Sequence, residues 1–528
     1  MAATGGSGGE DSSRTWGRRL RLCFAFGLSL AGAACGGGDQ SSNALRPGSG
    51  GSGGSGMVGM GAGGATGAAG ATMTTGTAGA TGTAGTTGAA GTTGTAGTGG
   101  PQPAANCSDL FTPTLQTFSV DISPSDWAAI QSEFLTAGML RDNDFVQYQP
   151  VLYPVVFHYG AETVTDAFIH LRGDSSWREA VQFDGANGKM QFGIVFDQTN
   201  PSANFHGLGK LKFDMPRSDP TFLRDRIANN WLRVVGHPAV CTTSGQLMIN
   251  GSLYGVYVAE DHFSGRLLKE YFPGNSNGDL FDGGWTAVTN QLNPNTARQK
   301  QFWAATTPAA MSAIVDVPNS FLAWAGECIL NDADGYWGGD HNFYIYDQGP
   351  AAGYVFISKD LDSTLDYLGQ FASDPITWWS ARSHWDLAIP QHYLIMAGDD
   401  GLRAQFVEAV RTTLAQYDPA LLQGWIDTWS AQVRAAVMAD PHKATGATIQ
   451  DFDAAIMLAR SGMADRADYL KRWLACWDSG TGVDQDGDGF IWCKDCRDDL
   501  ASVHPGAPEV CGNGIDDNCN GVVDDGCP

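Results

Sequence analysis

The sequence has few basic residues. Its 528 residues include 31 Lys and Arg against 56 Asp and Glu, and the formal net charge is −25 at pH 7. Nucleic-acid binding needs clustered Lys and Arg to neutralise phosphates, and the part of the chain with a globular composition contains no such cluster. We therefore expect no nucleic-acid partner.

The apolar run near the N-terminus, residues 22–34, is too short to span a membrane. Four arginines precede it within residues 14–21, and this order is typical of an export signal. Residues 30–35 resemble a lipobox, in which Cys35 is acylated and becomes the mature N-terminus. An ordinary cleaved signal is the alternative, because Gly32 stands where an aliphatic residue is usual. We expect residues 1–35 to be a lipoprotein-type signal peptide that leads to a lipid-anchored protein of the cell envelope, at the outer membrane or cell surface.

Large apolar side chains are scarce in residues 36–105, which consist mostly of Gly, Ala, Thr and Ser. So little apolar surface cannot offset the entropy lost on ordering the chain. We expect this stretch to be a disordered linker.

Residues 106–477 have a globular composition and contain most of the aromatic residues. Segments 151–157, 164–171 and 190–196 read as strands, and 247–250 and 254–259 as two more. Between them, Asp219-Pro220 is typical of a helix N-cap and first turn, and Gly236 of the helix end. A mostly helical part follows from residue 302 to about 474. The pattern predicts an α+β domain.

The most informative stretch is residues 325–366. Residues 321–330 read as a helix that runs into a polar loop, and segments 343–346 and 354–358 read as two strands of a hairpin. An antiparallel hairpin returns the chain to its start, so Asn342 and Asp360 should lie side by side. An Asp in the loop, an Asn and a later Asp occur in the order that protein kinases use to orient a hydroxyl and hold magnesium on phosphates.

Eight short elements in this order resemble the CotH (spore-coat protein H) kinase family. The first is Arg172-Gly173-Asp174-Ser175-Ser176, and the others are the segments 188–197, 205–208, 219–224, 249–260, 334–336, 341–346 and 359–362. The resemblance covers roughly residues 151–366. It implies a bilobal atypical protein-kinase-like fold that binds ATP with magnesium or manganese and phosphorylates Ser or Thr of a protein substrate.

The resemblance also implies roles for single residues. Asp334 would be the catalytic base, Lys189 would contact the ATP phosphates, and Asn342 and Asp360 would bind the metal. The weaker candidates are Glu260 for the nucleotide and Asp362 for the metal.

Several alternatives stay open. Lys212 is the other candidate for the phosphate contact, and Asp225 is a guess for the acidic partner of Lys189. Asp334 and Asp340 could be ordinary turn residues. The sequence departs from the family at Gly188 and Lys359, where a second lysine and an aromatic residue are usual.

Residues 478–528 have a different character, with twelve Asp or Glu against one Lys and one Arg. Too few apolar residues are present for a core. Two loops have the ligand spacing of calcium sites. The predicted calcium ligands are Asp484, Asp486, Asp488, Phe490 and Asp495 in the first loop, and Asp516, Asn518, Asn520 and Asp524 in the weaker second loop.

Nine cysteines follow the signal and linker, and five of them lie in residues 493–527. An exported protein favours disulfides, with at least one thiol left unpaired. Cys493 and Cys496 could instead be half of a zinc site. The segment resembles the MopE-type metal-binding repeats of secreted bacterial proteins, some of which are linked to copper, although no Met or His cluster here requires copper.

Two classes of function follow. We expect an exported kinase that transfers the γ-phosphate of ATP to protein Ser or Thr. The alternative is a non-catalytic surface adhesion or scaffold lipoprotein whose calcium-binding C-terminal module is the binding part.

Overall fold

The computed structural model describes residues 107–140, 148–173, 175–214, 219–283, 286–339, 341–365, 372–376, 396, 398–444, 446–520, 524 and 526–527. The predicted signal peptide with Cys35, the predicted linker and Asp340 lie outside these residues. Within the described ranges, no helix combines the length and the apolar character needed to cross a membrane.

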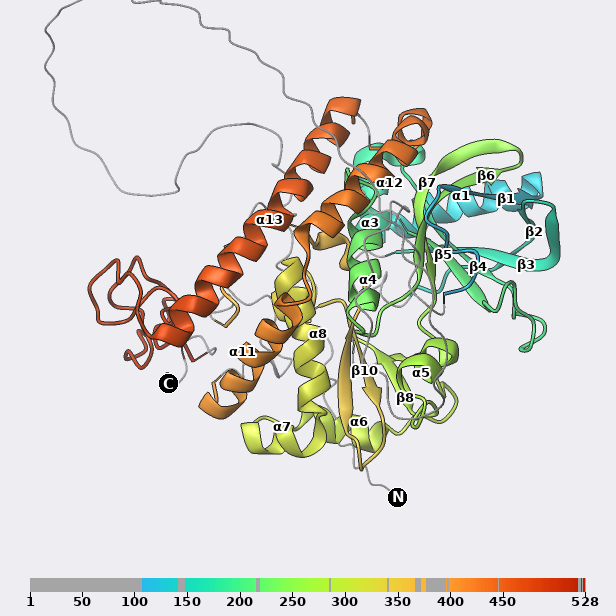
Figure 1. Cartoon of the computed structure of the whole chain (residues 1–528). Coiled ribbons are helices and arrows are strands. Elements are labelled where there is room, and N and C mark those ends of the chain that lie inside the picture. Colours follow the sequence, from blue (N-terminus) through green and yellow to red (C-terminus); the bar gives the residue numbers. More distant parts are fainter. Residues whose placement is uncertain are drawn as a thin grey trace, which may run out of the picture. The chain divides into compact units, whose positions relative to one another are not determined.

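Seven strands close into a barrel in the order β1-β2-β3-β4-β5-β7-β6 (Figure 1). Neighbouring strands are antiparallel except β1 and β6, which are parallel. Successive side chains of a strand point to opposite faces, and Phe118, Phe192 and Phe213 fill the interior. The strands are β1 (Gln116–Ile122), β2 (Tyr153–Tyr159), β3 (Glu162–Arg172), β4 (Gln191–Val195), β5 (Lys210–Asp214), β6 (Thr242–Ile249) and β7 (Ser252–Asp261).

A helix, α4 (Arg224–Val234), lies against β6 on the outside of the barrel. The predicted start of this helix was wrong, because the N-cap is Leu223 and not Asp219. The Asp219 carboxylate instead accepts hydrogen bonds from the backbone N–H and the guanidinium of Arg224, and from Thr221. Asp219 therefore stabilises the turn that leads into the helix.

A second sheet has the strand order β11-β10-β8-β9. It contains the predicted hairpin, and the helix predicted before it is also confirmed as α8 (Val317–Leu330). The largest apolar core surrounds α8 and includes Trp324 and Phe356. The strands are β8 (Asp279–Asp282), β9 (Thr286–Ala287), β10 (Phe343–Asp347) and β11 (Tyr354–Ser358).

Helices make up most of the rest, so the α+β prediction is confirmed. Figure 1 shows the long helices α12 and α13 running side by side, and α12 also contacts β7 of the barrel. The remaining helices are α1 (Pro124–Gly138), α3 (Ser175–Asp184), η1 (Gly185–Asn187), α5 (Gly265–Tyr271), α6 (Thr296–Trp303), α7 (Pro308–Ile314), α9 (Tyr336–Gly339), η2 (Leu361–Ser363), α11 (Asp400–Leu414), α12 (Pro419–Ala439) and α13 (Ile449–Ser479).

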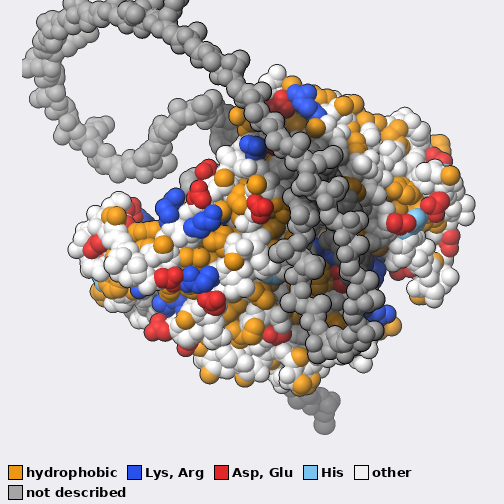
Figure 2. Space-filling view, viewed as in Figure 1, with side chains coloured by type: hydrophobic (Ala, Val, Ile, Leu, Met, Phe, Trp, Pro, Cys, Tyr) orange, Lys and Arg blue, Asp and Glu red, His pale blue; other side chains and the backbone are white. Residues whose placement is uncertain are grey.

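Charged side chains on the face drawn in Figure 2 mix both signs, and the side chains coloured there form no broad basic patch. Exposed ion pairs on the helices follow the same pattern. Arg411 pairs with Asp478, Arg434 with Asp453, and Arg460 with Asp427. The expectation of no nucleic-acid partner stays a prediction.

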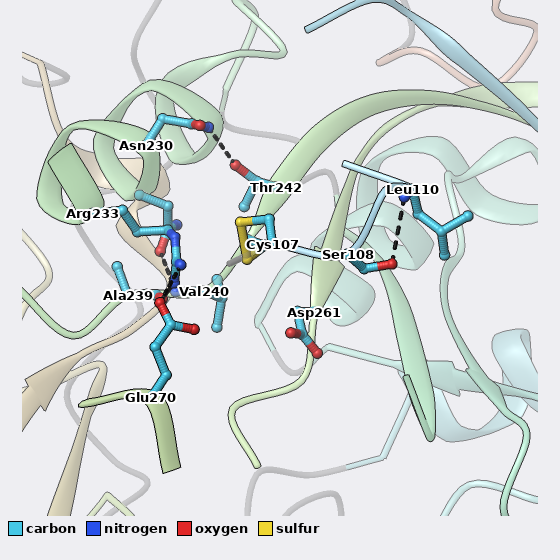
Figure 3. Close-up of a disulfide and its surroundings, with 12 residues drawn as sticks. Cys107, Ser108, Leu110, Asn230, Arg233, Ala239, Val240, Thr242, Asp261 and Glu270 are labelled. Carbon is cyan, nitrogen blue, oxygen red and sulfur yellow. Dashed lines mark hydrogen bonds and ion pairs between the residues drawn. A yellow bond between two sulfur atoms is a disulfide. The ribbon is translucent and has the colours of Figure 1, made fainter. Parts of the chain in front are cut away.

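Among the residues that the structure describes, four disulfides close loops, and the predicted unpaired thiol is the buried Cys328. Cys493 and Cys496 bond to different partners, so the disulfide prediction is confirmed and the zinc alternative is wrong. Figure 3 shows Cys107 bonded beside Val240 and Thr242, where β6 begins. The pairs are Cys107–Cys241, Cys476–Cys493, Cys496–Cys519 and Cys511–Cys527.

The Cys107–Cys241 bond closes the longest loop, with a sequence separation of 134. Because such a cross-link restricts the unfolded chain, the double variant Cys107→Ala/Cys241→Ala should lose roughly 2–5 kcal/mol of unfolding free energy. Urea unfolding measures this loss. Cys328→Ser, which opens no loop, is the control and should change the midpoint less. Equal midpoints for the double variant and the wild type would contradict the prediction.

Candidate functional site

The β10–β11 hairpin brings Asn342 and Asp360 together, as predicted. Phe343 pairs with Ser358 in the register, and the backbone N–H of Lys359 donates to the carbonyl of Asn342 at 3.1 Å. Asn342 and Asp360 have φ angles of 46° and 55°. Both residues therefore leave the strand conformation at the same end of the hairpin, where their side chains are free to face other elements.

The loop after α8 places Asp334 next to Asn342. The Asn342 Nδ2 group donates to Asp334 Oδ2 at 3.0 Å, and the Asp334 side chain is 51% exposed. The buried Asp332 carboxylate accepts the backbone N–H of Asp334 at 3.2 Å. Asp334 is thus held by the backbone while its carboxylate stays open to solvent.

Buried Glu327 on α8 fastens this loop to the hairpin. Its carboxylate accepts the Ser358 hydroxyl at 2.6 Å and the backbone N–H of Trp337 at 2.7 Å. A Cβ at Gly335 would lie 2.5 Å from Asp332 Oδ2 and 2.9 Å from Glu327 Cδ, which leaves room only for glycine there. Burial raises the pKa of Glu327 to about 7.

The outer face of the barrel contributes cations and more carboxylates. Lys212 on β5 lies opposite Glu260 on β7, with 3.7 Å between Nζ and Oε2. Arg172, at the end of β3, forms an ion pair with Asp214. Neither Arg172 nor Asp214 was predicted as a site residue, although Arg172 opens the first of the elements that resemble the CotH family; no local pattern marks Asp214.

Asp225 on α4 joins the barrel face to the hairpin. Its Oδ1 accepts the backbone N–H of Leu361 at 2.8 Å, and burial, with the nearby Glu260 and Asp360 carboxylates, raises its pKa. Asp225, Glu260 and Asp360 therefore belong to one group of carboxylates. With Asp214, Asp334, Asp362, Asn342, Arg172 and Lys212 we call this group the acidic cluster.

The carboxylates of the acidic cluster shift one another's proton affinity. Burial is the largest cause of a raised pKa for Asp225 and Asp362, and neighbouring carboxylates add to it. The Asp360 side chain reaches solvent, yet the protein around it removes much of its water, and with Asp214 this raises its pKa to about 6. A bound cation would relieve this repulsion.

Lys189 lies elsewhere. Its buried Nζ donates to Asp440 Oδ2 and to the Val256 carbonyl, each at 2.6 Å. Val256 is four residues before Glu260 on β7, about 13 Å along the strand. Asp440 is fully buried and also accepts the backbone N–H groups of Val256 and His442.

Asp225 was therefore the wrong guess for the partner of Lys189, and Asp440 is the partner. Asp440 was missed because it follows Lys189 by 251 residues, and no local pattern marks it. The structure does not bring Lys189 to the acidic cluster, whereas it places the alternative lysine, Lys212, within it.

The first predicted calcium loop brings three of its five predicted ligands together. Carboxylate oxygens of Asp484, Asp486 and Asp488 lie within 4.8 Å of one another. Asp484 accepts the backbone N–H groups of Gly487 and Gly489, which curls the loop around them. Burial, with the nearby Asp488 and Asp486, raises the pKa of the largely buried Asp495 to about 6.

The second predicted calcium loop is less complete. Asp516 and Asn518 both accept the backbone N–H of Asn520, and Asp524 accepts that of Gly512. Within the described part of the tail, these residues do not form a cluster of three His, Cys, Asp or Glu ligands.

Comparisons with known proteins match two parts of the chain. Residues 169–475, more than half of the sequence, match the family model described as "CotH kinase protein". Residues 495–525 match the Cu-binding MopE model, described as "Putative metal-binding motif". No curated protein matches the chain. The first match runs from β3 into α13 and contains every residue of the acidic cluster.

The raised pKa of Glu327 predicts a pH-dependent stability. Between the pKa of about 4.5 expected in the unfolded chain and about 7 in the folded protein, the folded state binds the extra proton, so stability falls as pH rises through this window. In the wild type, the unfolding free energy should fall by an amount on the order of 1–3 kcal/mol across this window, and Glu327→Gln should remove the fall. Urea unfolding from pH 4.5 to 7.5 measures it, with the exposed Glu408→Gln as control. A profile of Glu327→Gln parallel to that of the wild type would refute the assignment.

Proposed function

Because the chain belongs to the CotH kinase family and carries a MopE-type metal-binding motif, we propose that it is an exported kinase. It transfers the γ-phosphate of ATP to Ser or Thr of a protein substrate. In this proposal the barrel and the part built around α8 are the two lobes of an atypical kinase-like fold. A lipid on Cys35 anchors the protein to the cell envelope.

The observation that supports this function best is the convergence of Asp334, Asn342 and Asp360 at one end of the β10–β11 hairpin. The side chain of Asp334 is 51% exposed, and it is suited to accept the proton of a substrate hydroxyl. The hydroxyl oxygen then bonds to the γ-phosphorus, and the bond from phosphorus to the β–γ bridging oxygen breaks, with ADP leaving.

Magnesium or manganese fits the donor set. Asn342 and Asp360 offer the hard oxygen ligands that both ions prefer, and Asp362 is the further candidate. Burial and neighbouring carboxylates raise the pKa values of Asp360 and Asp362, and a divalent cation would offset that repulsion. When bound, such an ion supplies positive charge to the phosphates.

We assign the phosphate contacts to Lys212 and Arg172 rather than to Lys189. Lys212 is 19% exposed beside Glu260, and Arg172 is 21% exposed beside Asp214, so both can turn toward a ligand. Lys189 is held by Asp440 in a buried ion pair that ties the end of α12 to the barrel. Releasing Lys189 would leave the buried Asp440 unpaired, which is costly.

The non-catalytic scaffold remains the second candidate, because the tail has a metal-loop geometry of its own. Asp486, Asp488 and Asp495 each have one buried oxygen without a hydrogen-bond partner. Carboxylate oxygens of Asp484, Asp486 and Asp488 lie within 4.8 Å of one another, and such hard oxygen ligands suit calcium. We propose that calcium binds Asp484, Asp486, Asp488, Asp495 and the carbonyl of Phe490, and more weakly the second loop at Asp516, Asn518, Asn520 and Asp524.

Label transfer from γ-labelled ATP tests the kinase. The protein from Asn106 onward is incubated with magnesium or manganese and a Ser-rich acceptor protein. We expect transfer by the wild type and a loss of about 10²–10⁴-fold in Asp334→Ala, as for other general bases. Asp360→Ala should also lose label transfer, because the substitution removes a ligand of the proposed metal.

Asp427→Ala is the control for these variants, because it removes a carboxylate from the exposed surface of α12. Absence of both label transfer and metal-dependent ATP binding in the folded wild type would refute the kinase and favour the scaffold.

Calcium should stabilise the tail in proportion to its binding. At a calcium concentration 100 times the dissociation constant, the unfolding free energy should rise by about 2.7 kcal/mol. Asp486→Asn/Asp488→Asn should abolish the rise, whereas Asp499→Asn, on the exposed surface nearby, should retain it. Thermal unfolding followed by tryptophan fluorescence, with and without calcium, gives the shift. The same shift in the double variant would place the calcium elsewhere.

A further inference from the structure

The side chains on the outer face of β3 change from aromatic to cationic along the strand. Phe168, His170 and Arg172 point outward on alternate positions, while Ala167, Ile169 and Leu171 fill the barrel interior. The first two outward residues are aromatic and partly exposed, and the third is the cation of the acidic cluster. One strand face therefore offers an aromatic surface that leads to a positive charge.

Gly193 allows the His170 ring to lie flat on the sheet. Gly193 is opposite His170 on the neighbouring strand β4. A Cβ at this position would lie 2.3 Å from His170 Nε2 and 2.7 Å from Cε1, so the imidazole occupies the space of the missing side chain. Any larger residue at position 193 would lift or turn the ring.

The His170 ring is also fixed in orientation. Nδ1 donates to the carbonyl of Leu171 at 2.8 Å, and a carbonyl can only accept, so this nitrogen carries the proton. Burial lowers the pKa of His170, with Arg172 and Lys210 adding to the effect, and the ring is therefore neutral. The His170 imidazole is therefore a neutral aromatic ring held in one position.

The His170 ring lies at a suitable distance from Arg172 and Lys212, the proposed phosphate contacts. Arg172 follows His170 by two positions, about 6.6 Å along the strand. Lys212 is the next residue in the same row beyond Gly193, about 9.6 Å from His170 at two strand spacings. A ligand with a flat aromatic part at one end and phosphates at the other would span this distance.

We propose that His170, supported by Gly193 and flanked by Phe168, is the surface on which the nucleotide base stacks. This inference rests on the proposed kinase function and names the determinant of its base binding. A neutral ring stacks on a purine without adding charge, while Arg172 and Lys212 receive the phosphates. Aromatic stacking of one base is worth about 1–3 kcal/mol, or roughly 5- to 150-fold in affinity.

The test compares ATP with inorganic tripolyphosphate, which has the phosphates and no base. Calorimetric titration in the presence of manganese gives both dissociation constants. His170→Ala should weaken ATP binding at least fivefold and leave tripolyphosphate binding unchanged. His170→Phe should retain most of the ATP affinity, because it keeps an aromatic ring.

Gly193→Ala is the second variant. Gly193 lies in a regular strand without a positive φ, so its added methyl group acts only by displacing the His170 ring. It should weaken ATP binding as His170→Ala does. His158→Ala is the matched control, since His158 lies on β2 and contacts Thr163 and Asp121.

The outcomes separate this inference from the proposed function. Equal effects of His170→Ala on ATP and on tripolyphosphate, or no effect on either, would overturn the stacking surface while the kinase stands. A folded wild type that binds neither ligand with manganese would overturn both.

Discussion

The antiparallel pairing of β10 and β11 is the constraint on which the site depends. It sets Asn342 beside Asp360, and the side chain of Asn342 then holds Asp334. Glu327 bonds to Ser358 at the end of β11 and to the loop that carries Asp334. A one-residue slip of the hairpin would turn every side chain of the strand to the other face, and the three functional groups would separate.

The cluster is costly for the fold. Several carboxylates lie near one another, and Arg172, Lys212 and Lys359 supply positive charge close by. Like charges in partly desolvated surroundings raise one another's pKa, as at Asp225, Asp360 and Asp362. A protein that keeps such an arrangement gains stability when a divalent cation binds, which couples folding at this point to metal binding.

Much of the site could be predicted from the sequence because its parts are local. The helix before the loop, the two strands of the hairpin and the residues at their ends lie within about forty positions, and helix and strand patterns operate over that range. The same holds for the first predicted calcium loop, whose aspartates alternate within five residues. The confirmed elements are those for which one stretch of chain carries the whole signal.

The missed parts depend on contacts between distant segments. Strands β1 and β5 were not predicted, and β1 completes the barrel by pairing with β2 on one side and with β6, more than one hundred residues later, on the other. Asp440 was missed as the counter-ion of Lys189 for the same reason, because the two residues are 251 positions apart in the sequence. Asp219 looked like a helix cap, but the guanidinium of Arg224 competes for its carboxylate. Tertiary contacts decided each of these cases against the local pattern.

The central claim is that a divalent metal binds at the end of the hairpin together with a nucleotide. Crystals grown with manganese and a non-hydrolysable ATP analogue test it directly, because anomalous scattering locates manganese without reference to the protein. The account predicts an anomalous peak between Asn342 and Asp360, with the triphosphate toward Lys212 and Arg172. Ordered analogue and manganese at other residues, with the hairpin end empty, would contradict it.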